Sequence, residues 1–91
     1  MGFETGITVR YWAAAKAATG VGEEVLDADG GLTLAALVER VVAAHPGRKV
    51  ADVIGVCSVL VDDQPVSSRE PDSVRLLPGQ AVEFLPPFAG G

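Results

Sequence analysis

One segment of the chain, residues 33–44, has the apolar spacing of a single amphipathic helix, and this pattern limits the possible folds most strongly. Its apolar residues recur at the three- and four-residue steps that line one side of a helix, namely Leu34, Leu37, Val38, Val41 and Val42. Thr33 is a suitable N-cap, and Pro46 disfavours helical geometry in the residue before it, so the helix is expected to stop there. A helix with one apolar face needs a second layer to cover that face.

Short strand patterns on both sides of the helix can supply this layer. In the strand expected over residues 7–12, alternation turns one set of side chains toward the core, namely Ile7, Val9 and Tyr11. The opposite set then faces away from the core, namely Thr8, Arg10 and Trp12. In the last strand, residues 81–85, Val82 and Phe84 are expected inside, with Glu83 and Leu85 outside. A weaker strand pattern covers residues 23–27, and another strand is expected over residues 58–61.

The remaining segments are expected to be helical turns, reverse turns and loops. A helical turn is expected over residues 13–18, and another is one interpretation of the ambiguous residues 50–56. Pro78 and Gly79 suit the two central positions of a type II turn. The other connections are expected to be a turn and a polar loop, at residues 62–65 and 67–73.

The order of strand, strand, helix, strand, strand predicts an α+β fold with one main helix packed on a mixed sheet. If both end strands lie near the sheet centre, the fold is a β-grasp, although periodicity alone leaves the strand order open. In a chain of 91 residues a second domain would have no core of its own. We therefore expect one domain over residues 1–91, with residues 86–91 as a flexible tail.

Charge and composition argue against several classes of function. Twelve acidic and seven basic residues give a net charge of −5, whereas nucleic-acid binders carry a basic surface that neutralises phosphates. No apolar stretch approaches the ~20 residues that cross a bilayer, and no signal-peptide pattern is evident. We therefore expect a soluble, cytoplasmic protein that binds neither nucleic acid nor membrane.

Few residues could carry catalysis within this chain. His45, the single histidine, is expected at the helix end, where the helix dipole favours a partial positive charge. Cys57, the single cysteine, lies in an apolar strand pattern without basic neighbours, so we expect a small buried residue and no reactive thiolate. No Cys/His cluster suggests a metal site, and no glycine pattern suggests a phosphate loop. We expect no self-contained enzyme site, bound cofactor or metal.

The C-terminal end has an unusual composition. Pro86 and Pro87 stiffen the exit from the last strand, and Gly90 and Gly91 place a carboxylate on a tip without side chains. Such a tip can enter a channel that any side chain would block. A frayed end with flexible glycines is the plainer interpretation, and physical reasoning alone does not separate the two.

The sequence FLPPFAGG resembles the signature tail of the MoaD/ThiS family of ubiquitin-like sulfur carriers, and most closely the tails of MoaD-type members, the small subunits of molybdopterin synthase. Three further segments resemble the family's first strand and turn, its helix, and a later strand, namely ITVRYWAAAKAATG, TLAALVERVVAAHP and SVLVDDQPV. The likeness covers nearly the whole chain, and its specific part is the tail. The family's β-grasp fold agrees with the order of elements predicted above.

The resemblance implies a carrier whose C-terminal glycine, Gly91, bears the chemistry, with Gly90 before it. A separate E1-like, MoeB-like activating enzyme would use ATP to adenylate the carboxylate, and a sulfur donor would convert it into a thiocarboxylate. The thiocarboxylate would give its sulfur to molybdopterin in a MoaE-like large subunit. The chain itself would be a co-substrate and not an enzyme.

Partner contacts are expected beside the tail. Alternation turns Trp12 and Leu85 away from the core, and in the β-grasp fold implied by the resemblance their strands are neighbours. Lys16 lies where relatives often carry a basic residue, and Phe88 with Ala89 would line the partner's channel. A plainer interpretation is that Trp12 only covers its own sheet edge.

Other functions fit the same tail. Carriers for thiamine, for cysteine or for tRNA thiolation use the same terminal chemistry. From a different class, the chain could be a ubiquitin-like modifier, whose tail forms isopeptide bonds, or an interaction module.

Overall fold

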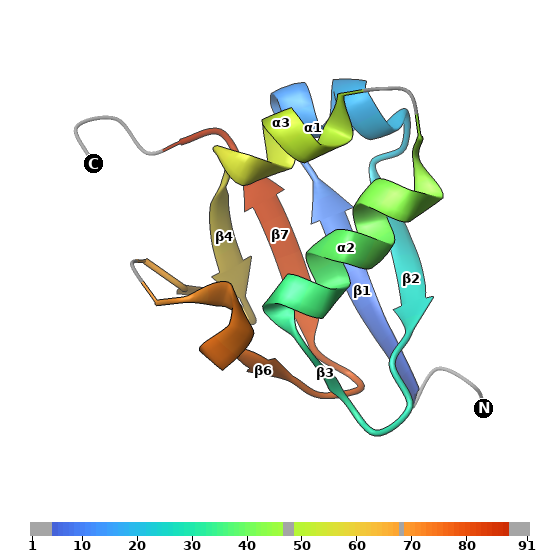
Figure 1. Cartoon of the computed structure of the whole chain (residues 1–91), viewed down its shortest axis with the longest axis vertical. Coiled ribbons are helices and arrows are strands. Elements are labelled where there is room, and N and C mark those ends of the chain that lie inside the picture. The colour runs from blue at the N-terminus through green and yellow to red at the C-terminus, as the bar shows by residue number, and fades with distance from the viewer. Residues whose placement is uncertain (1–4, 47–48, 68, 88–91) are drawn as a thin grey trace.

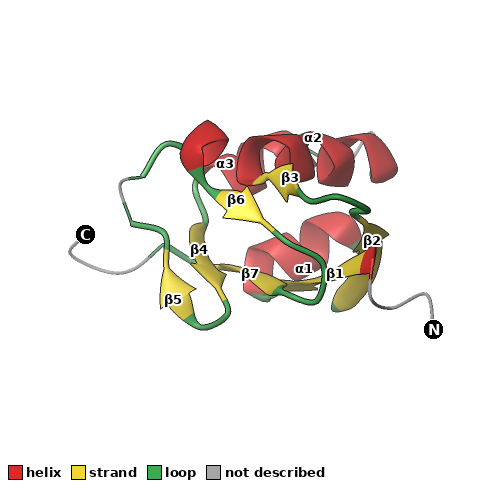
Figure 2. Ribbon diagram, turned by 90° about the horizontal axis from the view of Figure 1, so that it is seen from below, coloured by secondary structure: helices red, strands yellow, loops and turns green. Residues whose placement is uncertain are grey.

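A five-stranded mixed sheet with helices packed on one face forms the centre of the molecule (Figures 1 and 2). The computed structural model describes residues 5–46, 49–67 and 69–87. The sheet has the order β2-β1-β7-β4-β5, and its strands are β1 (Gly6–Tyr11), β2 (Glu23–Asp27), β4 (Ser58–Val61), β5 (Gln64–Pro65) and β7 (Ala81–Leu85). The helices are α1 (Ala13–Thr19), α2 (Leu34–Ala44) and α3 (Val50–Gly55). A 3₁₀ turn, η2 (Pro71–Ser73), and a small second sheet of β3 (Leu32–Thr33) and β6 (Arg75–Leu76) complete the described chain.

The first and last strands pair in parallel at the centre of the main sheet. Tyr11 of β1 lies opposite Phe84 of β7, and β2 and β4 flank this pair as antiparallel neighbours. This strand order is that of a β-grasp, which periodicity alone had left open. The α+β prediction with one main helix is confirmed.

The core fills the space between this sheet and α2, which lies across it in Figure 1. The side chains expected to point inward from β1 and β7 are all buried, namely Ile7, Val9, Tyr11, Val82 and Phe84. Val41 on α2 is fully buried as well. The ring of Phe84 stacks on that of Tyr11 with centroids 6.0 Å apart, so the central strand pair also anchors the aromatic part of the core.

The ends of α2 match their sequence signals. The Thr33 hydroxyl accepts a hydrogen bond from the Ala36 amide at 3.1 Å, which satisfies one of the free donors of the first turn. The helix ends at Ala44 with His45 as its C-cap, immediately before Pro46. The helical turns expected after β1 and over residues 50–56 are present as α1 and α3.

Trp12 and Cys57 lie outside the strands in which the sequence pattern placed them. Strand β1 ends at Tyr11, because the carbonyl of Trp12 accepts the amide of Ala15 and Trp12 thereby becomes the N-cap of α1. The amide of Cys57 donates to the carbonyl of Ile54 at 3.1 Å, so this residue closes α3 and precedes β4. The hydrogen bonds of the adjoining helix therefore make β1 end before Trp12 and β4 begin after Cys57.

Some short elements differ from the expected turns and loops. Residues Asp62 and Asp63 have φ values of 49° and 68° and form a two-residue hairpin turn, so Gln64–Pro65 returns as strand β5 rather than remaining in the turn. Part of the expected polar loop forms the 3₁₀ turn η2, and β3 and β6 pair although neither was predicted. Strands of two residues are too short to show an alternating pattern.

Candidate functional site

The exit of the C-terminal tail lies at the end of a central strand. Strand β7 ends at Leu85, whose backbone lies opposite Ser58 of β4. Pro86 and Pro87 follow as exposed residues. The predicted tail residues Phe88, Ala89, Gly90 and Gly91 lie outside the described residues, so the structure defines the base from which the tail starts.

Trp12 lies beside this exit on the sheet face that α2 does not cover. Its backbone amide donates to the carbonyl of Phe84 at 3.1 Å, which continues the β1–β7 pairing and places Trp12 next to Leu85. The indole N–H donates to Glu83 Oε1 at 2.9 Å, and 49% of the residue remains exposed. The alternation pattern therefore predicted correctly that Trp12 and Leu85 face away from the core.

Two further apolar residues lie near Leu85 on this face, and sequence reasoning missed them. Leu60 of β4 pairs with Glu83, and Pro65 of β5 pairs with Leu60, so both side chains lie on the same side of the sheet as Leu85. Leu60 is half-buried and Pro65 is exposed. The alternation of residues 58–61 was the signal that could have found Leu60. We refer to Trp12, Leu60, Pro65 and Leu85 as the open-face patch.

Charged side chains border the open-face patch near Trp12. Lys16 is exposed on α1 and lines a shallow pocket of about 560 Å³ together with Trp12. Arg10 lines the same pocket and pairs with Glu23 at 3.2 Å, whereas Lys16 forms no hydrogen bond or ion pair with a described residue. The structure thus brings Lys16, Trp12 and Leu85 to one end of the sheet, as an apolar centre with a polar rim.

His45 belongs to a polar cluster at the other edge of the core, away from the tail. Its Nε2 lies 2.8 Å from Glu24 Oε2, which also accepts a 2.5 Å hydrogen bond from the Tyr11 hydroxyl. Burial, reinforced by the hydrogen bond to Glu24, raises the pKa of the Tyr11 hydroxyl. Burial alone would raise the pKa of the Glu24 carboxyl, but the hydrogen bonds from Tyr11 and His45 outweigh it and lower that pKa. The cluster joins β1, β2 and the end of α2, which is a structural role.

The described residues contain no cluster of side chains suited to a metal ion. Among them, no three His, Cys, Asp or Glu side chains gather where they could hold a metal ion. Cys57 is half-buried and donates from Sγ to the carbonyl of Val53 at 3.2 Å, and burial raises the pKa of its thiol. Within the described ranges, no helix has the length and apolar character to span a membrane.

Comparison of the sequence with protein-family models identifies the family of this chain. The model of the ThiS family matches residues 9–91, which is most of the chain and includes its last residue. The chain belongs to the ThiS family. This family contains ubiquitin-like sulfur carriers and modifiers, so the resemblance seen in the sequence is confirmed. No curated protein matches the sequence significantly.

Solved structures agree with the ubiquitin-like β-grasp fold of this ThiS family chain. The putative molybdopterin converting factor subunit 1 of Pyrococcus furiosus is 21% identical, with a TM-score of 0.76 over 92% of this chain and 99% of that one. Small archaeal modifier protein 1 of Methanosarcina acetivorans is 18% identical, with a TM-score of 0.75 over 96% and 97%. In a complex of subunits 1 and 2 of the molybdopterin-converting factor from Helicobacter pylori, the matching chain is 19% identical, with a TM-score of 0.60 over 94% and 99%.

Proposed function

We propose that the chain is a sulfur carrier whose C-terminal Gly91 is adenylated and then converted into a thiocarboxylate. The observation that carries the proposal is the family match through residue 91, in a chain whose PPFAGG end follows directly from a central strand. Gly90 and Gly91 provide a carboxylate on a tip without side chains, which fits a narrow channel. The chain then acts as a co-substrate, and the catalytic groups belong to its partners.

The chemistry requires an activating partner because a carboxylate is a poor electrophile. A carboxylate oxygen of Gly91 attacks the α-phosphate of ATP in an E1-like, MoeB-like enzyme and releases pyrophosphate, which leaves an acyl adenylate. A sulfur donor then displaces AMP, so one carboxylate oxygen departs with AMP and one sulfur replaces it. The thiocarboxylate sulfur is a better nucleophile than the original oxygen, and it can be transferred to an acceptor substrate.

Molybdopterin synthesis is the pathway that we propose for this carrier, supported by two of the similar structures. Two of the similar structures are subunit 1 of a molybdopterin-converting factor, and one of these is in complex with subunit 2. By analogy, a MoaE-like large subunit receives the tail of this chain and uses its sulfur for the dithiolene of molybdopterin. ATP is used by the activating enzyme, and no cofactor is assigned to the chain itself.

The open-face patch is the proposed docking surface for both partners. It combines a half-exposed tryptophan with Leu60, Pro65 and Leu85 next to the strand end that leads into the tail. Tryptophan is enriched among residues that dominate binding energy, and a fixed surface beside a tail aligns the tip with an active site. Lys16 adds a cation at the rim, and Phe88 with Ala89 would contact the entrance of the partner's channel.

Coexpression with a MoeB-like activating enzyme and a sulfur donor tests the carrier function. Intact-mass spectrometry is expected to show replacement of one oxygen by one sulfur at the C-terminus, with pyrophosphate released during adenylation. A chain without Gly91, or one with an added alanine after it, is expected to fold normally and to give neither product. Adenylation of the shortened chain would contradict the proposed mechanism.

A modifier function is the second candidate, because the chain also resembles a small archaeal modifier protein. A modifier would use the same adenylate, but its carbonyl carbon would end on a lysine amine as an isopeptide. The same mass-spectrometry experiment separates the two, since lysine conjugates identify a modifier and a terminal thiocarboxylate identifies a carrier. Reconstitution with a MoaE-like subunit then distinguishes molybdopterin synthesis from carriers for thiamine, cysteine or tRNA thiolation.

A further inference from the structure

A second surface feature lies mainly on the helix-covered side of the sheet and reaches the open-face patch only at Pro65. It is a groove of about 700 Å³ between α2, the end of α3, and the segment that runs from β4 to η2. The groove exists because β4 and β5 extend the sheet beyond the part that α2 covers (Figure 2). Its walls are largely apolar and include Leu34, Val38, Ile54, Val59, Val66 and Phe84.

Arg69 is the charged residue among those that line the groove. Its amide donates to the carbonyl of Val66, but its guanidinium forms no hydrogen bond or ion pair with any described residue. The other described arginines all have such partners, since Arg10 pairs with Glu23 while Arg40 and Arg75 donate to backbone carbonyls. An apolar groove with one unpaired cation at its rim suits a ligand with a large apolar group near a carboxylate.

The end of this chain has that chemistry and starts at the edge of the groove. Leu85 lies opposite Ser58, and Ser58 itself lines the groove. Residues Pro86 to Gly91 provide six positions, which span about 20 Å when extended. Ser58 and Arg69 both line the groove, so a segment that starts beside Ser58 can follow the groove toward Arg69.

We propose that the groove binds the chain's own C-terminal segment, with the Phe88 ring among the apolar walls and the Gly91 carboxylate on the Arg69 guanidinium. Phenylalanine buries a large apolar area, and a guanidinium can hold a carboxylate through two parallel hydrogen bonds. Docking withdraws the carboxylate from partners while leaving Trp12, Leu60 and Leu85 of the open-face patch uncovered, since none of these three lines the groove. The inference concerns the free chain and holds whichever reaction Gly91 undergoes.

Cys57 provides a built-in reporter of docking, because it is half-buried and lines the same groove. We would measure its labelling rate by the uncharged reagent N-ethylmaleimide in the full-length protein. Substituting Phe88→Ala is expected to raise that rate by about threefold or more, the factor for a segment docked in about two-thirds of the molecules. Phe3→Ala is the matched control and is expected to leave the rate unchanged.

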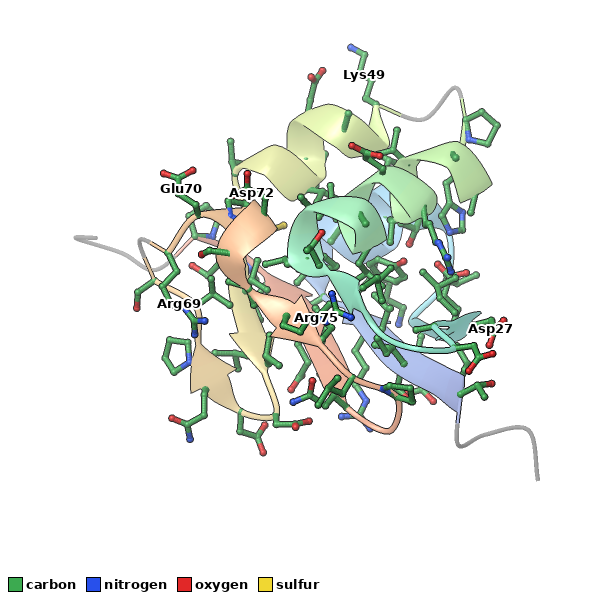
Figure 3. All side chains as sticks on the ribbon, turned by 60° about the horizontal axis from the view of Figure 1, so that its bottom comes forward. Asp27, Lys49, Arg69, Glu70, Asp72 and Arg75 are labelled. Atoms are coloured by element: carbon green, nitrogen blue, oxygen red, sulfur yellow. The ribbon has the colours of Figure 1, made fainter. Side chains whose placement is uncertain are left out.

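Arg69→Gln tests the carboxylate contact. The direction in which the labelling rate of Cys57 changes separates docking from a direct charge effect. Loss of a nearby cation makes a thiolate less stable, which would slow the labelling of Cys57. Loss of docking exposes the thiol and accelerates labelling, which is the result we expect. Lys49→Gln is the matched control, since Lys49 projects outward beside α3 while Arg69 lies on the segment leading into η2 (Figure 3).

Filling the groove gives an independent measurement. Ala35 lines the groove on α2, so Ala35→Phe is expected to displace the segment, whereas Ala44→Phe on an exposed part of the same helix is not. Methyl resonances of Val38 and Val59 are expected to move toward the same undocked positions in Phe88→Ala and Arg69→Gln. Unchanged labelling and methyl shifts in both variants would overturn the proposal. Shifts that grow with protein concentration would also overturn it, because they would assign the groove to the tail of a second copy.

Discussion

The two faces of the main sheet belong to the same strands, but one face forms the buried core and the other is open to partners. On the face covered by α2, the paired residues Tyr11 and Phe84 are buried and their rings stack. On the open face, one residue away in each strand, Arg10 lies opposite Glu83, and the latter accepts the indole N–H of Trp12. Because successive side chains of a strand point to opposite faces, a step of one residue changes the expected consequence of a substitution from lost stability to altered binding.

Phe84→Ala, on the covered face, is expected to cause the largest loss of stability. The side chain is fully buried and stacks on Tyr11, so its loss is expected to lower the free energy of unfolding by about 3–5 kcal/mol. Chemical denaturation measures the change. The neighbouring Leu85→Ala, on the open face, is the control and is expected to cost about 1 kcal/mol. Equal losses in the two variants would contradict the assignment of faces.

The double variant Trp12→Ala with Leu85→Ala tests the open face. We expect a folded protein whose binding to the activating enzyme, or to the large subunit, weakens by about 2 kcal/mol or more. Isothermal titration calorimetry with each partner measures this change. Substituting Val25→Ala, an apolar residue 61% exposed on the edge strand β2, serves as the control. Full affinity of the double variant for both partners would restrict recognition to the tail.

Glu24→Gln tests how much the Glu24 carboxylate, at the polar edge of the covered face, contributes to stability. The pKa of Glu24 is lowered in the fold, so its carboxylate stabilises the fold above its unfolded pKa, and this contribution is lost as the pH falls through the lower folded value. At pH 7 we expect the variant to lose about 1–2 kcal/mol of stability. The difference from the unsubstituted chain should shrink below about pH 4, where the unfolded carboxyl is protonated. Thermal melts across this pH range provide the measurement, and a pH-independent difference would argue against the ionic contribution.

Glu23→Gln is expected to have the smallest effect. The Arg10–Glu23 pair lies on the open face with side chains that are 44% and 58% exposed, so water screens the attraction. Its loss is expected to change stability by about 0.5 kcal/mol or less. Denaturation at low and at high salt tests this, and a large salt-sensitive loss would show that the pair belongs to the structural framework.

Local patterns were sufficient to predict the elements that carry strong periodicity. The α2 helix has a regular apolar face, an N-cap at Thr33 and a proline after its end, so several signals agree on its limits. Strand β7 likewise shows clear alternation. In contrast, the parallel pairing of β1 with β7 joins residues more than 70 positions apart, and no local pattern encodes which strands become neighbours.

The residues and contacts of the candidate site likewise include some that local patterns predicted and some that they did not. Alternation identified Trp12 and Leu85, and the tail was recognisable from its composition. The bond from Trp12 to Glu83 depends on strand register, and the contacts among Tyr11, Glu24 and His45 depend on where α2 ends above the sheet. These contacts arise only after tertiary packing, so sequence spacing could not reveal them.

The central pairing of the two terminal strands has a consequence for protein synthesis. During translation the segment of β1 leaves the ribosome well before that of β7, its parallel neighbour in the sheet. Contacts between distant segments form slowly, because a long loop must close before they gain any stabilisation. A chain that has been synthesised only as far as β6 therefore lacks the middle of its sheet, so the core can close only after β7 is available.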